Sequence, residues 1–288
     1  MEKKRKGATN GDTVVSNKDI AAYYDTHQFW YSHFWSPAAL HYGFWYEDTK
    51  DLAEAILNTN KFVIDALWIN HEDVVLDAGC GVGGSSIYIA ETTGARVEGV
   101  TLSEVQLKIA TERAGRSSAS DLLRFSLQDY TCTNFGGGTF SKIFGIESIC
   151  HANKKIDFLK EAYRLMQPGG KIAVADAFLT KEDLDAEENN IYTNFIEGWV
   201  LPNLATKDRF QKDLLETGFT NVLFRDMHDK VKRSSEIIYN HSRFTYPFNL
   251  IGSKLGLVPR NFSARYQKEF FDRKIAVYGV FVAEKPAT

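Results

Sequence analysis

A glycine-rich run directly after an apolar segment constrains this 288-residue chain more than any other feature. Residues 74–78 read VVLDA, and residues 79–84 then read GCGVGG. Glycines permit a tight turn and let a ligand approach the backbone, and a helix that follows offers unpaired N–H groups in its first turn. Asp77 stands at the end of the predicted strand, where its carboxylate can face a ligand cation or hydroxyl. The run therefore predicts a strand–turn–helix unit with a ligand site at the turn.

The same glycines satisfy a second interpretation. Gly79, Gly81 and Gly84 match G-x-G-x-x-G, the dinucleotide fingerprint. That fingerprint is accompanied by an acidic residue about 20 residues further on, at the end of the second strand. Here the second predicted strand ends at Thr101, and Glu98 lies within it. The missing acid argues against a dinucleotide site, so an NAD(P)-dependent oxidoreductase of Rossmann fold is the alternative function rather than the main hypothesis.

Composition excludes several classes. Hydrophobic residues make up 44% and charged residues 25%, and the net charge is −3, so no overall basic field attracts nucleic acid. Residues 1–15, with a KKRK run, are predicted to be a disordered tail. No apolar stretch reaches the length of a membrane span, so we expect no integral membrane segment. Three cysteines without framework or zinc spacing indicate a reducing, cytoplasmic location and no metal site.

Apolar segments and breakers alternate as in a doubly wound α/β sheet. Residues 167–170 (QPGG) predict a break before the strand at 171–177. Two segments interrupt the alternation, and we expect helical additions at 181–205 and 229–272. The predicted helices are 16–35, 49–68, 84–93, 103–115, 154–166 and 206–217. The predicted strands are 73–78, 96–101, 122–127, 140–146, 171–177, 219–226 and 274–284.

Four segments carry a family resemblance: DAGCGVGG at 77–84, GVTLSEVQ at 99–106, IESICHA at 146–152 and LHYGFW at 40–45. They resemble the class I S-adenosylmethionine (SAM) dependent small-molecule methyltransferases, in the branch of tocopherol, sterol and cyclopropane-fatty-acid methyltransferases. The resemblance implies a Rossmann-like doubly wound sheet, SAM as cofactor and a small-molecule acceptor. That acceptor is expected to be lipophilic (isoprenoid-, sterol- or tocopherol-like), as in secondary metabolism.

The resemblance also implies an arrangement of the chain. It predicts an N-terminal helical lid over residues 16–70 and a SAM-binding methyltransferase domain over residues 71–288. A SAM-binding protein without turnover is a further alternative. The methylated atom (carbon, oxygen or nitrogen) and the oligomeric state are left open.

Cofactor contacts follow from matching positions. Thr101 stands where methyltransferases at large have an acid for the ribose hydroxyls, and Asp129 stands where an adenine amino group is met. Cys150 replaces a glutamate of cyclopropane synthases, which argues against cyclopropanation. The expected cofactor-binding residues are Tyr24, His41, Asp77, Gly79, Cys80, Gly81, Thr101, Leu102, Gln106, Gln128, Asp129 and Ile146.

Glu147 and His151 are the candidate catalytic residues. They follow the fourth predicted strand, at the edge where open α/β sheets place their chemistry. A carboxylate and an imidazole can act as general base and orienter if the acceptor must lose a proton. The structural alternative is that His151 begins the next helix and Glu147 braces the loop.

Aromatic residues are concentrated before the core. Positions 23–46 hold eleven of them in 24 residues, against 13% in the whole chain. They can fasten a helix to the sheet, or they can form a wall whose ring faces stabilise a cation. A second set is predicted to line the opposite side of a pocket for an apolar acceptor: Trp199, Tyr239, Phe244, Tyr246 and Phe248.

Overall fold

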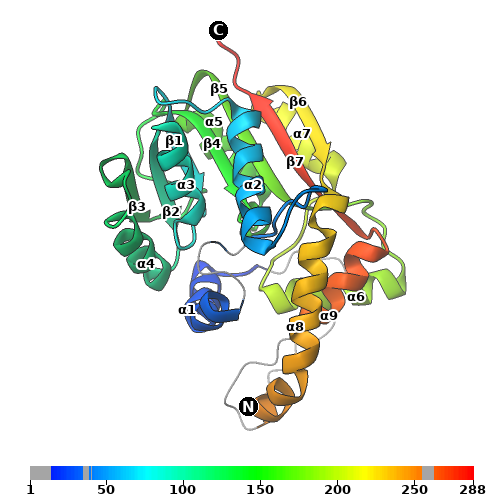
Figure 1. Ribbon diagram of the computed structural model, residues 1–288. Coiled ribbons are helices and arrows are strands. Elements are labelled where there is room, and N and C mark those ends of the chain that lie inside the picture. Colours follow the sequence, from blue (N-terminus) through cyan, green and yellow to red (C-terminus); the bar gives the residue numbers. More distant parts are fainter. Residues whose placement is uncertain (1–13, 35–38, 40, 255–262) are drawn as a thin grey trace.

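The computed structural model describes residues 14–34, 39, 41–254 and 263–288 (Figure 1). Within these residues one seven-stranded sheet has the order β3-β2-β1-β4-β5-β7-β6. The first five strands are parallel, and β7 runs antiparallel to both of its neighbours. The strands are β1 (Val74–Ala78), β2 (Arg96–Thr101), β3 (Leu123–Leu127), β4 (Phe140–Ile146), β5 (Met166–Leu179), β6 (Thr220–Asp226) and β7 (Ala276–Glu284).

Helices cover both faces of this sheet. Figure 1 shows α2 and α3 on one face, with α5 and α7 behind the other. Two apolar cores result: Leu67 and Ile89 pack on one face, while Phe158 and Phe210 pack on the opposite one. These helices are α2 (Leu52–Leu67), α3 (Gly84–Thr93), α4 (Glu104–Ala114), α5 (Lys155–Leu165) and α7 (Lys207–Thr217). The predicted Rossmann-like doubly wound fold is confirmed.

A third group of helices lies beyond the carboxyl ends of the parallel strands (Figure 1). Phe195 of α6 stacks on Phe270 of α9 with ring centroids 4.4 Å apart, and α9 packs against α8. The helices are α1 (Asn17–Phe34), α6 (Ala186–Trp199), α8 (His228–Lys254) and α9 (Ser263–Asp272). The short η2 (Ile149–His151) follows β4 at this edge, whereas the short η1 (Ser120–Leu122) precedes β3 at the other edge. The first helix of the predicted lid and the helices of the two predicted additions thus lie at the edge where ligands bind in open α/β sheets. The second helix of the predicted lid, α2, instead packs on a face of the sheet.

Local signals in the sequence explain where several helices begin and end. Asp51 caps α2 by accepting from the Glu54 N–H, and Asp185 with Glu188 forms a capping box at α6. Gly218 ends α7 in the left-handed region, at φ 107°. These caps satisfy N–H and C=O groups that helix ends otherwise leave unpaired.

The predicted break at residues 167–170 is wrong in one respect, because β5 already begins at Met166. The pairing register with β4 shifts between Phe140 and Lys142, which places a bulge at this point. Gly169, at φ 77°, donates its N–H to the Lys285 carbonyl. The breaker residues thus stay in the strand because the segment after β7 supplies their hydrogen bonds.

Two further expectations concern membranes and metals. In the described part of the chain, no helix has the length and apolar character needed to cross a bilayer. The same residues contain no group of three or more His, Cys, Asp or Glu side chains placed to hold a metal ion. Residues 1–13 of the predicted tail lie outside the described residues.

Candidate active site

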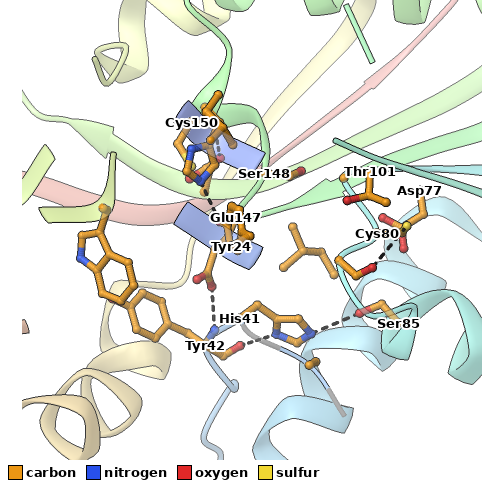
Figure 2. Close-up of a pocket in the computed structure, with 18 of the residues that line it drawn as sticks. Tyr24, His41, Tyr42, Asp77, Cys80, Ser85, Thr101, Glu147, Ser148 and Cys150 are labelled. Atoms are coloured by element: carbon orange, nitrogen blue, oxygen red, sulfur yellow. Dashed lines mark hydrogen bonds between the residues drawn. The ribbon is translucent and has the colours of Figure 1, made fainter. Parts of the chain in front are cut away.

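One large cavity opens at the carboxyl ends of β1, β2, β4 and β5, beneath the helical layer (Figure 2). It encloses about 1440 Å³ of empty space, its open mouth included. The glycine loop lines one end, and side chains from α6, α8 and α9 line the other. The cavity therefore extends from the glycine loop to the helical layer.

Two glycines of the loop have no room for a side chain, whereas a third has open space beside it. A Cβ on Gly79, at φ 104°, would lie 2.4 Å from the Ser148 Cβ, and one on Gly83, at φ 78°, would lie 2.9 Å from the Phe125 ring. Gly81 also has a positive φ, 52°, but its nearest neighbour would be the Gln106 amide nitrogen at 3.9 Å. The first two glycines let the loop pack against the sheet, whereas Gly81 leaves its backbone open to a ligand.

Asp77 ends β1 beside this loop and is only 3% exposed. Its Oδ2 accepts from the Ser86 hydroxyl at 2.6 Å. Burial raises the pKa of this carboxyl to about 7, although the hydrogen bond from Ser86 acts to lower it. Asp77 therefore titrates near neutral pH, and a cation bound nearby would favour its ionised form. Burial also raises the pKa of the neighbouring Cys80 thiol, which keeps that thiol protonated.

At the end of β2, Thr101 and Gln106 form a polar wall. The Thr101 hydroxyl donates to Gln106 Oε1 at 3.2 Å, and the Gln106 amide donates to Gln28 Oε1 of α1 at 3.3 Å. Ser103, which caps α4, donates its hydroxyl to Asp25 of α1. These bonds hold the predicted lid helix over the glycine-loop end of the cavity.

Gln128 and Asp129 follow β3 but differ in placement. Gln128 lines the cavity, whereas Asp129 is not among the described lining residues. Asp129 Oδ1 accepts from the Thr131 backbone N–H at 2.8 Å, and its Oδ2 accepts from the Asn17 amide at 2.7 Å. The carboxylate thus fastens the start of α1, and its expected contact with adenine stays a prediction.

Glu147 follows β4 in a left-handed backbone conformation, at φ 50°. Its Oε1 accepts from the Tyr42 backbone N–H at 2.7 Å (Figure 2). The same oxygen accepts from the Tyr278 hydroxyl at 2.9 Å. Burial raises the pKa of this carboxyl to about 8, the Tyr42 bond opposes the rise, and nearby Asp176 adds to it. The strained turn places a proton-exchanging group on the cavity wall.

His151, in η2, lines the same cavity and contacts the helix α1. Its Nε2 lies 2.8 Å from the Tyr24 hydroxyl of α1. Burial, with Lys155 nearby, lowers the pKa of His151 to about 4, and burial raises the pKa of Tyr24 well above its usual value. At neutral pH this contact therefore joins two uncharged groups.

His41 holds the chain that enters the cavity. The Tyr42 carbonyl can only accept, so His41 Nδ1 donates to it at 2.8 Å. His41 Nε2 then accepts from the Ser85 hydroxyl at 3.2 Å (Figure 2). Burial lowers the pKa of His41 to about 4, so the ring is neutral. His41 thereby ties this segment to the first turn of α3.

Asp176 was not among the residues expected from the sequence. It lines the cavity from β5, where its Oδ2 accepts from the Cys150 N–H and its Oδ1 from the Ala177 N–H. Burial raises its pKa to about 6. A single acid inside the apolar run IAVADAF was the available signal. Lys155 completes the support of η2 by donating to the backbone carbonyls of Cys150, Ala152 and Asn203.

The predicted aromatic wall is present in part. Trp199 lines the cavity, and Tyr239 is not among the described lining residues. The side chains of Phe244, Tyr246 and Phe248 lie outside the described residues, as do those of positions 29–38 in the first aromatic set. The apolar lining at this end comes from Phe195, Trp199, Leu201, Leu204, Ile238 and Phe271.

The expected cofactor residues gather around the cavity. Apart from Asp129, each of them lines it, as do Glu147 and His151. Three of these residues come from the glycine loop, and Asp77 comes from the end of β1. The others come from α1, the segment at 41–42, α4, η2 and the ends of β2, β3 and β4. The structure thus brings these side chains together, while their individual roles stay predictions.

The sheet order and the loop after β1 define the class. A dinucleotide-binding sheet has the order 3-2-1-4-5-6, whereas this one inserts an antiparallel β7 between β5 and β6. A geranyl diphosphate C-methyltransferase from Streptomyces coelicolor A3(2) has the same fold (TM-score 0.73, 17% identity, covering 96% of this chain and 99% of that one). So does the [4+2]-cyclase SpnF (TM-score 0.75, 18% identity, 97% and 100%). This is the Rossmann-like fold of class I methyltransferases.

The chain belongs to the family described as mycolic acid cyclopropane synthetase, whose profile matches residues 12–233. It is 30% identical over 215 residues to sterol 24-C-methyltransferase ERG6 of Saccharomyces cerevisiae (74% of this chain, 56% of that protein). It is also 30% identical over 205 residues to erythromycin 3''-O-methyltransferase of Saccharopolyspora erythraea (67% and 66%). The chain thus spans between about half and two thirds of the length of these relatives. The family resemblance expected from the sequence is confirmed.

Proposed function

We propose that this protein transfers the methyl group of SAM to a small lipophilic acceptor. One observation carries the proposal: a single cavity joins the open glycine loop to a buried carboxyl and imidazole surrounded by apolar side chains. The relatives include a sterol C-methyltransferase and an erythromycin O-methyltransferase. Both names support an acceptor with a large apolar part, and they leave the methylated atom open.

The residues at the loop end fit SAM. Gly81 leaves the space beside its backbone open, and Asp77 can become the counter-ion of an ammonium group because its pKa lies near neutrality. Thr101, Gln106 and Gln128 add hydroxyl and amide groups for a ribose and a base. When bound, SAM supplies an electrophilic methyl group on a positively charged sulfur.

The opposite end can manage the acceptor's proton. Glu147 has one carboxyl oxygen bonded to Tyr42 and Tyr278, and the other makes no hydrogen bond to the described residues. A base is most effective when its pKa lies near the working pH, and positive charge in the cavity would lower the pKa of Glu147 from about 8. Glu147 can thus accept a proton from a carbon or hydroxyl acceptor, while Tyr24 and His151 close the cavity against water.

The test uses the purified protein with SAM that carries a labelled methyl group and fractionated metabolites of the host. We expect a labelled lipophilic product and S-adenosylhomocysteine in equal amounts, detected by mass spectrometry. Binding of S-adenosylhomocysteine without any turnover would instead support a non-catalytic SAM-binding protein. A rise in melting temperature with NAD but not with SAM would support the oxidoreductase alternative.

The setting of this reaction is also part of the proposal. The described cysteines Cys80, Cys132 and Cys150 are free thiols, which supports a reducing compartment such as the cytoplasm. Detection of the native protein in cytosolic fractions of the host would test that location.

A further inference from the structure

Ser234 in α8 holds the segment at residues 42–45 by three hydrogen bonds. Its side chain is fully buried. The Ser234 hydroxyl accepts from the Gly43 N–H at 3.0 Å and from Trp45 Nε1 at 2.9 Å, and it donates to the Gly43 carbonyl at 3.1 Å. A hydroxyl has one donor and two acceptor positions, so all of its capacity is used on this segment.

The opposite side of the same segment rests on α2. Thr59 donates its hydroxyl to the Tyr42 carbonyl at 3.0 Å, and the Phe44 N–H donates to the Ala55 carbonyl at 2.9 Å. A Cβ on Gly43 would lie only 2.4 Å from the Ala55 Cβ. The segment therefore fits between α2 and α8 without space to shift.

This fixed segment begins with an N–H that bonds to Glu147 on the cavity wall. The Tyr42 N–H, one residue before Gly43, donates to Glu147 Oε1 at 2.7 Å (Figure 2). We propose that Ser234 is a positioning residue, which keeps the Tyr42 N–H directed at the Glu147 carboxyl by holding Gly43 against α8. The inference deepens the proposed function and rests on it, because it takes Glu147 as the group that accepts the acceptor's proton.

The effect of the Tyr42 N–H on the pKa of Glu147 can be distinguished from the effects of the other groups around Glu147. A hydrogen bond from an N–H stabilises the carboxylate form and lowers its pKa, and the Tyr42 bond has this effect on Glu147. Loss of the bond would therefore raise the pKa of Glu147 above about 8. Several titratable groups face Glu147. Tyr42 belongs to the segment that Ser234 holds, whereas the remaining described groups lie on other elements: Asp176 on β5, Tyr278 on β7, Tyr24 on α1 and Cys150 in η2.

The experiment follows the titration of Glu147 directly. The full-length protein is labelled with carbon-13 at the glutamate side-chain carboxyls, and the Glu147→Gln spectrum identifies the Glu147 resonance. In Ser234→Ala we expect the pKa of Glu147 to rise by about half a unit or more, about a threefold increase in proton affinity. Ser235→Ala is the matched control, because its buried hydroxyl lies next along α8 and bonds to Gln267 instead. It should leave the titration unchanged.

A second variant keeps the test decisive if Ser234→Ala does not fold. Thr59→Val keeps nearly the same shape and removes one of the two side-chain donors to the Tyr42 carbonyl, the other being His41. It should therefore also raise the pKa of Glu147. An unchanged Glu147 titration in either folded variant would overturn the role of this segment. Full methyl transfer by Glu147→Gln would instead overturn the proposed role of Glu147, whatever the titrations show.

Discussion

The Tyr24 hydroxyl lies 2.8 Å from His151 Nε2, and this contact joins two segments that are 127 residues apart in the chain. The same helix, α1, bonds to the opposite wall of the cavity through Asp25 to Ser103 and through Gln28 to Gln106. The helix α1, which is predicted to be part of a lid, is therefore fastened on both sides of the cavity by polar contacts. Such contacts can break and re-form, because each exchanges readily for bonds to water.

Removal of the Tyr24 hydroxyl should loosen this lid. A net hydrogen bond contributes about 0.5–1.5 kcal/mol, so Tyr24→Phe should shift α1 toward the open form by about two- to tenfold. Hydrogen exchange of residues 17–28 with S-adenosylhomocysteine bound measures the change. Thr26→Val, at an exposed position of the same helix, is the control. Equal protection in Tyr24→Phe and the wild type would argue against a lid held by this bond.

Binding of the cofactor should depend on the open space at Gly81. Gly81→Arg would fill the volume beside the loop and should weaken S-adenosylhomocysteine binding by at least about a hundredfold, or nearly 3 kcal/mol. Gly138→Arg is the matched control, because Gly138 also has a positive φ, 67°, and no atom within 4 Å of its Cβ position. Calorimetry on both variants provides the measurement. Unchanged affinity in Gly81→Arg would contradict the assignment of the loop.

Much of the fold could be predicted because breakers and caps mark the ends of its elements. The strand at 96–101 and the helix at 84–93 have the expected bounds, since glycines stand before the helix and after it. The early start of β5 could not be predicted, because Met166 pairs with Phe140 of β4 and the following glycines bond to the segment after β7. Long-range pairing of that kind leaves no local signal.

The site likewise contains residues that could be predicted from the sequence and residues that could not. Gly81 and Asp77 could be placed from one continuous motif. Asp176 was missed because a single acid within an apolar strand does not reveal which face it occupies until the pairing is known. Ser234 was missed because its partner Gly43 lies 191 residues away. Sequence patterns identify residues that meet a ligand through a local turn, and they do not identify residues that act through a distant backbone group.

The raised pKa of Glu147 should make the free energy of unfolding depend on pH. The folded protein holds this proton up to about pH 8, whereas the unfolded chain releases it near the usual value of 4.5. The contribution is therefore fully present below about pH 4.5 and is lost as pH rises through about 8. In Glu147→Gln this loss is absent, so the variant should gain stability relative to the wild type between these values. Urea unfolding at several pH values tests this, and parallel pH profiles for the two proteins would contradict it.

Turnover should depend on Glu147 and His151 more strongly than SAM binding does. A positioned general base contributes about a hundredfold to ten-thousandfold to rate, so Glu147→Gln should reduce turnover of a carbon or hydroxyl acceptor by that order. His151→Ala should also reduce turnover, because the Tyr24 hydroxyl loses its partner. In both variants the affinity for S-adenosylhomocysteine should stay within a few fold, since a collapsed loop would weaken binding and turnover together. Glu182→Gln, an exposed acid on the helical addition, should behave as wild type. Near wild-type rates in both variants would indicate an amine acceptor that arrives deprotonated, or a base supplied from the insertion at 181–205.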